Sequence, residues 1–193
     1  DQGHLKPLPR IKSVGRFREG LCFAQSDSTA GYIDHSTHWR IEARYLIASE
    51  FSEGLACVSL DGESFGYIDH FGQLVIEPQF EEARRFAEGI APVRRDGKWG
   101  YINRRGAISI ACQFDGPRAQ PFTSGLAGVC YRGRWGFIQR SGDWVIMPQY
   151  EDLGRIADGV APVRLDGKWG IVRLDGNIQC LPKFDELGEF EWG

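Results

Sequence analysis

Short runs in which apolar and polar residues alternate recur along the whole chain, and each is too short for an ordinary helix. In one stretch Ile90–Arg94 alternates in this way, and two further short runs, Trp99–Ile102 and Ala107–Ile110, follow the turn pairs Asp96-Gly97 and Arg105-Gly106. Alternation with a period of two is typical of a β-strand, and Asp-Gly is typical of a tight hairpin turn. This stretch therefore predicts three short antiparallel strands.

The same pattern returns at a regular interval. A glycine equivalent to Gly100 occurs at positions 31, 66, 100, 136 and 170, so the steps are 35, 34, 36 and 34 residues. A period this steady indicates small units that share one continuous core. We predict an all-β fold of tandem repeats, each of 34–36 residues with about three short antiparallel strands.

An open, elongated, solenoid-like row is the expected arrangement of these repeats. The alternative is a closed, propeller-like arrangement, which matching partial repeats at both ends would allow. Units of three strands do not match the four-stranded blades of a propeller, and this difference favours the open row.

The opening aromatic of each unit sets the repeat boundaries. Residues 1–16 are predicted to be the tail of a preceding repeat, and 190–193 the start of a further one, as in a fragment cut from a longer array. A natural end is the alternative. Between them we expect a degenerate repeat at 17–50 and full repeats at 51–85, 86–121, 122–155 and 156–189.

The composition of the chain limits which partners and which cellular compartment are expected. Lys and Arg number 23 and Asp and Glu 26, so a net charge of -3 gives no bulk attraction to nucleic acid or to an anionic membrane. No apolar run approaches the ~18 residues of a membrane helix. Five cysteines form an odd set without C-x-x-C spacing. Unpaired cysteines favour a cytoplasmic location, with export as the alternative if a leader was removed.

The repeat unit resembles the bacterial WG repeat, also called the KWG repeat. The resemblance rests on Asp96–Ile102, on its copies at 133–139 and 166–172, and on the fuller unit Gly54–Phe80. It covers nearly the whole chain, and the unit at 17–50 departs from it most. The resemblance implies an all-β, multi-copy scaffold that binds proteins or ligands, with no catalytic residues to carry over.

One motif has the form of a nucleophile elbow. Gly62-Glu63-Ser64-Phe65-Gly66 fits G-x-S-x-G, which requires a strand, a strained turn and a following helix. A strand is expected after Ser64 instead, and His70 is the only later histidine. His35 and His70 occupy equivalent turn positions one repeat apart, too few for a metal site. We therefore predict no enzyme activity, catalytic residue, cofactor or metal, and read both histidines as solvated turn residues.

The tryptophans separate into two groups. Trp99, Trp135 and Trp169 fall at equivalent positions and are predicted to be core residues, whereas Trp39 and Trp144 fall outside that set and could be exposed. Exposed aromatic residues beside turns can anchor a peptide or stack on a sugar ring.

Two segments differ most from the equivalent positions of the other repeats, and they suggest where a partner binds. Residues 26–29 replace the Asp-Gly turn in the first repeat, and residues 115–121 hold an insertion. Insertions in repeats map to loops and often decorate a binding face, with neutral drift as the alternative. We predict a non-enzymatic scaffold for a protein or peptide partner, with Trp39, Trp144, Arg118 and Gln120 as partner-binding residues. The alternative is a module that binds carbohydrate or the cell envelope.

Overall fold

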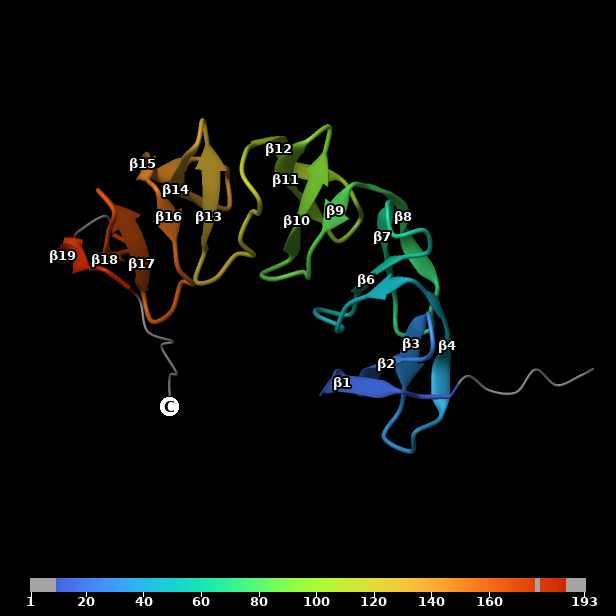
Figure 1. The fold of residues 1–193 in the computed structure, drawn as a ribbon. Coiled ribbons are helices and arrows are strands. Elements are labelled where there is room, and N and C mark those ends of the chain that lie inside the picture. The colour runs from blue at the N-terminus through green and yellow to red at the C-terminus, as the bar shows by residue number, and fades with distance from the viewer. Residues whose placement is uncertain (1–9, 176–177, 187–193) are drawn as a thin grey trace, which may run out of the picture. The chain divides into compact units, whose positions relative to one another are not determined.

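The computed structural model describes residues 10–175 and 178–186, and these divide into two compact units (Figure 1). Unit 1 ends at Arg85 and unit 2 begins at Phe86, which coincides with a predicted repeat boundary. Residues 1–9 of the predicted tail 1–16, residues 176–177 and 187–189 of the predicted repeat 156–189, and the predicted start of a further repeat at 190–193 lie outside the described residues. The open or closed arrangement of the repeats stays a prediction.

Unit 1 contains two antiparallel sheets whose strands follow chain order, β1-β2-β3-β4 and β5-β6-β7-β8. The strands are β1 (Ser13–Arg18), β2 (Leu21–Gln25), β3 (Ala30–Ile33), β4 (Trp39–Tyr45), β5 (Ile47–Ala48), β6 (Ala56–Ser59), β7 (Phe65–Ile68), β8 (Leu74–Phe80) and the two-residue β9 (Glu82–Ala83).

Unit 2 contains three sheets, built on β10-β11-β12, β13-β14-β15 and β16-β17-β18-β19. Its strands are β10 (Ile90–Arg95), β11 (Lys98–Asn103), β12 (Ile108–Phe114), β13 (Leu126–Tyr131), β14 (Arg134–Gln139), β15 (Trp144–Tyr150), β16 (Asp152–Leu153), β17 (Val160–Leu165), β18 (Lys168–Arg173) and β19 (Ile178–Phe184). The described residues contain no helix, so the all-β prediction of tandem, small antiparallel sheets is confirmed.

A short fourth strand is the main addition to the predicted repeat. Within the units, two-residue strands such as β5 and β16 pair with the first long strand of the following repeat. Two residues are too few for a period to be recognised in the sequence. They bring the sheets β5-β6-β7-β8 and β16-β17-β18-β19 to four strands, whereas the sheet β13-β14-β15 has three. The four-stranded sheets do not show the mismatch with propeller blades that favoured an open row.

The strands at the centre of each sheet are buried on both faces. All four residues of β3 and of β6 are buried, and so are the four middle residues of β14. Packing between sheets within a unit contributes to this burial, since Ala56 and Val58 of β6 share an apolar cluster with Tyr32 and Ile41 of the first sheet. The alternation predicted for Ile90–Arg94 is therefore not seen in burial, because residues 90–93 are all buried.

A glycine fixes the contact between the second and third long strands of each sheet. A Cβ atom built on Gly66 would lie 2.5 Å from the carbonyl oxygen of Ile76 and 2.8 Å from the nitrogen of Pro78. Gly31, Gly100 and Gly136 meet the equivalent backbone just as closely. The third strand bulges at this point, between the pairs Tyr67–Ile76 and Phe65–Phe80. A bulge leaves a residue out of the ladder, so Pro78 needs no N–H there.

Buried tyrosines connect one repeat to the chain that begins the next. The hydroxyl of Tyr32 donates to the carbonyl of Ser49 at 2.7 Å, and Tyr67 and Tyr101 donate to Arg84 and Gln120 in the same way. Each acceptor precedes the opening aromatic of the next repeat by two residues. Burial raises the pKa of all three hydroxyls well above the usual tyrosine value, so they remain protonated donors.

A second connection joins the opening turns of successive repeats. Glu19, at φ 52°, accepts a hydrogen bond of 2.9 Å from the amide of Gly54 in the next turn. In unit 2, Glu88 accepts from Gly125 at 3.0 Å. An acidic residue before the turn glycine therefore links neighbouring repeats as well as forming the turn.

The close approach at Gly66 predicts a large effect of one methyl group. Gly66→Ala places that methyl against the backbone of β8, which cannot rotate away, and should lower the free energy of unfolding by about 1–3 kcal/mol. Urea denaturation followed by circular dichroism measures this. The control is Gly15→Ala, where the nearest atom is Cδ1 of Phe23 at 3.4 Å and little change is expected. Equal effects of the two substitutions would contradict the role given to Gly66.

The tyrosine connection predicts a smaller effect. Tyr101→Phe keeps the ring and leaves the buried carbonyl of Gln120 without its donor, which should cost about 1 kcal/mol of unfolding free energy. The matched control is Tyr131→Phe, on a half-buried ring at the edge of the same core. If Tyr101→Phe is as stable as the unmodified chain, the hydroxyl does not hold the repeats together.

Candidate binding surface

The outward-facing side chains of the third long strands differ from repeat to repeat, whereas the inward-facing ones hardly change. These strands, β4, β8, β12 and β15, each lie at the edge of their sheet. The inward residues are Ile41, Ile76, Ile110 and Ile146, followed by Tyr45, Phe80, Phe114 and Tyr150, all of them buried. The exposed residues at the two positions flanking the isoleucine are Arg40, Val75, Ser109 and Val145, and Glu42, Glu77, Ala111 and Met147. We call these eight side chains the outer face.

The outer face is most apolar in the fourth repeat. Val145 is 39% exposed and Met147 is 64% exposed, and the two residues point the same way from β15. The neighbouring Trp144 is half-buried, because its ring packs at a centroid distance of 5.9 Å against Phe114 and at 6.2 Å against Tyr131. Trp144 thus supports the core from the side of the strand opposite to Val145 and Met147.

Trp39 occupies the equivalent position in β4. It is also half-buried, and it packs against a small cluster that includes Cys22, Ala24 and Ile33. The two tryptophans predicted to bind a partner therefore serve the core with one part of the ring and leave the rest exposed. Their role in binding stays a prediction.

The insertion at 115–121 ends the third repeat and pairs with β13, the first strand of the fourth repeat. The amides of Asp115 and Gln120 donate to the carbonyls of Cys130 and Gly128, at 2.8 and 3.0 Å. In the fifth repeat the equivalent donors are Glu151 and Gly154, which are two residues closer together in the chain. The insertion keeps both hydrogen bonds of the strand and adds two residues between them.

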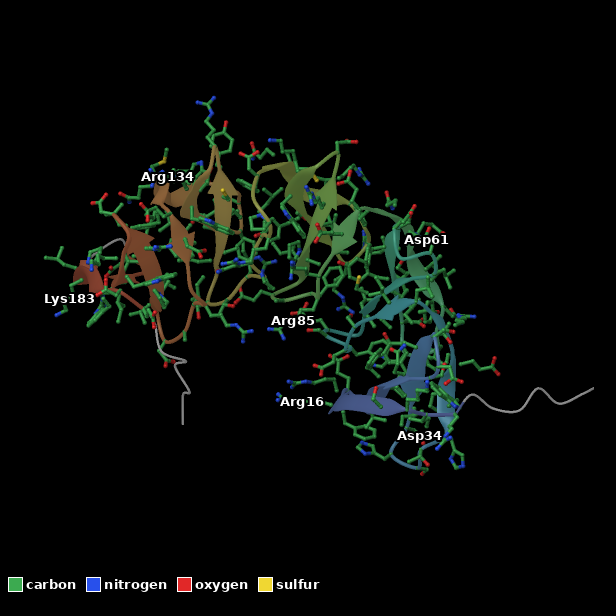
Figure 2. The ribbon with its side chains drawn as sticks, viewed as in Figure 1. Arg16, Asp34, Asp61, Arg85, Arg134 and Lys183 are labelled. Atoms are coloured by element: carbon green, nitrogen blue, oxygen red, sulfur yellow. The ribbon has the colours of Figure 1, made fainter. Side chains whose placement is uncertain are left out.

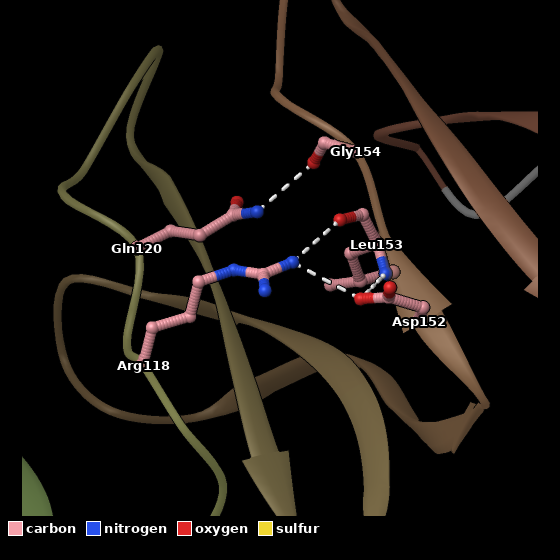
Figure 3. A network of polar contacts seen from close by, with 5 residues as sticks. All are labelled: Arg118, Gln120, Asp152, Leu153 and Gly154. Atoms are coloured by element: carbon pink, nitrogen blue, oxygen red, sulfur yellow. Dashed lines mark hydrogen bonds and ion pairs between the residues drawn. The ribbon is translucent and has the colours of Figure 1, made fainter. Parts of the chain in front are cut away.

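The two polar side chains predicted to bind a partner from this loop turn toward the next repeat (Figure 3). One Nη atom of Arg118 donates to Oδ1 of Asp152 and to the carbonyl of Leu153, each at 3.0 Å. Nε2 of Gln120 donates to the carbonyl of Gly154 at 2.9 Å. The guanidinium of Arg118 also lies 4.9 Å above the ring of Trp135. Both side chains therefore have a structural role, and partner binding by them stays a prediction.

The other variable segment, residues 26–29, is a tight internal turn. The hydroxyl of Ser26, a residue only 5% exposed, donates to the carbonyl of Thr29 at 2.9 Å. The hydroxyl of Thr29 donates in turn to the carbonyl of Ala43 at 3.2 Å. Asp27 is exposed and forms an ion pair with Lys12 at 2.7 Å. Of the four residues, Asp27 and Ser28 are the exposed ones.

The G-x-S-x-G motif forms an ordinary hairpin turn. The amide of Ser64 donates to Oδ1 of Asp61 at 2.7 Å, and that of Glu63 does so at 2.8 Å. These two bonds hold the pKa of Asp61 at about 2. Ser64 is followed directly by strand β7. The turn is therefore fixed by a carboxylate, and the helix of a nucleophile elbow does not follow it.

The two turn histidines stack on opening aromatics. The ring of His35 lies 4.0 Å from that of Phe17, and the ring of His70 lies 4.3 Å from that of Phe51. His35 is exposed as expected, but the reading of His70 as a solvated residue was wrong. Its side chain is 33% exposed, and Nε2 faces Oε2 of Glu19 at 3.1 Å.

Nothing in the described residues assembles a metal or redox site. No group of three His, Cys, Asp or Glu side chains converges there. Cys22, Cys57 and Cys130 are buried free thiols, and burial raises the pKa of each, to about 12 for Cys57. A thiol with a raised pKa is a poor nucleophile.

The concave features in unit 1 are shallow and of mixed charge. Depressions of about 390 and 380 Å³ flank the opening turn of the first repeat, and Glu19 borders both. Arginines and carboxylates alternate around them, including the pair Arg18–Glu50 at 3.4 Å. Figure 2 shows nitrogen and oxygen tips interspersed over both units.

Reading the sequence missed how the repeats are joined. The tyrosines were visible at the position after the repeated glycine, but their hydroxyl partners belong to irregular chain before the next repeat. The acidic residue before the turn glycine was visible at positions 19, 53 and 88. Its repetition beside a glycine with positive φ was the signal that could have revealed this contact.

The residues that the structure describes include no helix that could cross a membrane.

A family model and several solved structures match the chain. The model described as WG containing repeat matches four consecutive stretches, residues 31–63, 65–99, 99–135 and 135–169. No curated protein matches the chain by sequence.

The similar structures have low sequence identity. Hsv2 from Kluyveromyces marxianus aligns with a TM-score of 0.59 and 10% identity over 85% of this chain and 63% of Hsv2. PorZ from Porphyromonas gingivalis gives 0.55 and 9% over 90% of this chain and 28% of PorZ. BamB from Moraxella catarrhalis gives 0.54 and 14% over 86% of this chain and 62% of BamB. The chain spans less than two thirds of each, and the likeness is one of fold alone.

The contacts of Arg118 predict a stabilising effect. Arg118→Ala removes two hydrogen bonds to the next repeat and the contact with Trp135. Because the side chain is partly solvent-exposed, the loss of unfolding free energy should be about 1 kcal/mol. Thermal and urea denaturation measure it, with the exposed Arg155→Ala as the matched control, expected within about 0.5 kcal/mol of the unmodified chain. A neutral Arg118→Ala would show that the insertion does not hold the two sheets together.

Proposed function

The chain belongs to the WG containing repeat family, and we propose that it is a non-enzymatic scaffold whose outer face binds a protein or peptide partner. The observation that carries this proposal is the contrast within β4, β8, β12 and β15. The inward side chains of these strands are nearly constant, because they fill the same core in every repeat. The outward side chains vary more in size and charge, from Arg40 and Glu42 to Val145 and Met147, although Glu recurs at 42 and 77 and Val at 75 and 145. Such variation is expected for a surface that recognises a partner.

The position of the outer face suits an extended partner. Each of its strands lies at a sheet edge, and exposed edges can pair with an added strand or offer side chains at alternate positions. Val145 and Met147 of β15 form its most apolar pair. Burial of an apolar pair surrounded by polar residues is the usual source of binding energy at a protein interface.

Carbohydrate binding and enzyme activity have less support than binding of a protein or peptide. Trp99 and Trp135 are buried, which removes two of the aromatic rings that a sugar-binding platform would need. The turn around Ser64 has the geometry of a hairpin, and the described residues bring together no metal ligands. The proposal therefore rests on binding and not on catalysis.

The test begins with capture of a partner by the intact chain from bacterial lysate and envelope extract, with quantitative mass spectrometry of what is retained. The double substitution Val145→Asp with Met147→Asp should lower the recovery of the partner at least about tenfold, the effect of losing ~1.4 kcal/mol of binding free energy. The Kd of the purified partner then measures the same loss directly.

The matched control places the same charges on the equivalent positions of the third repeat, Ser109→Asp with Ala111→Asp. These sites are already polar or small and should leave most of the binding intact. Recovery that is equal for both double variants and the unmodified chain would contradict a role of the fourth repeat. Retention of glycan alone would contradict the protein or peptide partner.

A further inference from the structure

The first repeat exposes apolar residues whose equivalents are buried elsewhere. Phe17 is 41% exposed, whereas the opening aromatics Phe51, Phe86 and Phe122 are at most 3% exposed. Val14 is 56% exposed, whereas Leu153, which holds the same position before the fifth repeat, is 2% exposed. We call the surface formed by Val14, Phe17 and the turn at Gly20 the leading face.

A preceding sheet covers the interior equivalents of this face. The ring of Phe51 packs on Tyr32 of the repeat before it at a centroid distance of 4.8 Å, and Phe122 packs on Tyr101 at 5.0 Å. Leu153 packs into a cluster with residues of the preceding sheet. The structure thus shows what kind of surface fits a leading face, namely the side of a repeat that carries the residue after the repeated glycine.

The fifth repeat exposes the complementary surface. Phe184 is 44% exposed, whereas its equivalents Tyr45, Phe80, Phe114 and Tyr150 are at most 5% exposed. Trp169 and Ile171 are half-buried, whereas Trp99 and Tyr101 at the same positions are fully buried. We call the surface formed by Trp169, Ile171 and Phe184 the trailing face.

We propose that the trailing face of one copy of this chain docks on the leading face of a second copy, continuing the packing between repeats from one molecule to the next. The apolar positions match those of the interior contacts, with Ile171 replacing the tyrosine that covers Phe51 or Phe122. Exposed apolar faces on stacked repeats promote association with another surface.

A polar contact supports the same pairing. In the interior, the acidic residue of one opening turn accepts a hydrogen bond from the turn glycine of the next repeat, as Glu19 does from Gly54 and Glu88 from Gly125. Asp158 occupies the acidic position in the fifth repeat with φ 48°, and it is exposed. In the proposed contact, the carboxylate of Asp158 accepts from the amide of Gly20 in the second copy.

The two faces differ, so the contact is heterologous. Each copy can use its leading face and its trailing face at once, and association then continues to larger species unless it closes into a ring. This separates the proposal from a symmetric dimer, which stops at two copies. The proposal is independent of the partner assigned to the outer face.

The first measurement is the weight-average mass of the 193-residue chain by sedimentation equilibrium between about 1 μM and 1 mM, where weak contacts associate. The mass should rise with concentration beyond twice the monomer mass of 21.7 kDa. A chain that stays at 21.7 kDa throughout would overturn the proposal, and would leave both faces to another repeat of the same polypeptide or to an unrelated protein.

Two variants then identify the faces. Phe17→Glu places a charge on the leading face and Phe184→Glu on the trailing face, and each variant alone should remain monomeric. Mixed in equal amounts, they retain one intact leading face and one intact trailing face, so the mixture should form a heterodimer of twice 21.7 kDa and nothing larger. Dimerisation of the mixture also shows that both variants are folded.

The controls charge exposed apolar residues away from both faces. Leu60→Glu in a hairpin turn of unit 1 and Met147→Glu on β15 should associate like the unmodified chain. Association of either single phenylalanine variant at the level of the unmodified chain would overturn the proposal, and so would a mixture of the two that stays monomeric.

Discussion

The close approach of two strands at the repeated glycine is the contact on which each sheet depends. The third long strand bulges toward the second, and its backbone occupies the space that a side chain at Gly31, Gly66, Gly100 or Gly136 would need. The bulge directs one isoleucine and one aromatic residue of the same strand inward, where they complete the core. The preceding tryptophan or phenylalanine then packs beside them. One missing side chain thus sets the path of a whole strand.

The constant inward residues of each repeat allow the outward residues to vary. Because the glycine and the inward residues fix the backbone of β4, β8, β12 and β15, the outward residues are free to differ without changing the fold. They range from arginine and glutamate in the first repeat to valine and methionine in the fourth. A scaffold of this kind separates stability, which resides in the interior, from recognition, which resides on the surface.

Much of the fold could be predicted from the sequence, because it depends on features that repeat. The period of the glycines and the Asp-Gly turns are local signals, and they indicated the small antiparallel sheets correctly. The two-residue strands β5 and β16 were missed because pairing and not periodicity creates them. The surface was harder to predict, because a polar side chain such as Arg118 can either remain free to bind a partner or bond to a neighbouring part of the same chain. The sequence shows that Arg118 lies in an insertion, whereas only the folded chain shows that its guanidinium donates hydrogen bonds to Asp152 and Leu153.

The central claim is that a constant interior presents a variable outer face to a partner. Hydrogen–deuterium exchange of the chain with and without a captured partner tests it most directly. The account predicts that the backbone amides of β15 gain protection on binding, together with those of one or more of β4, β8 and β12, while the central strands β3, β6 and β14 change little. Protection confined to the hairpin turns or the central strands, with β15 unchanged, would contradict it.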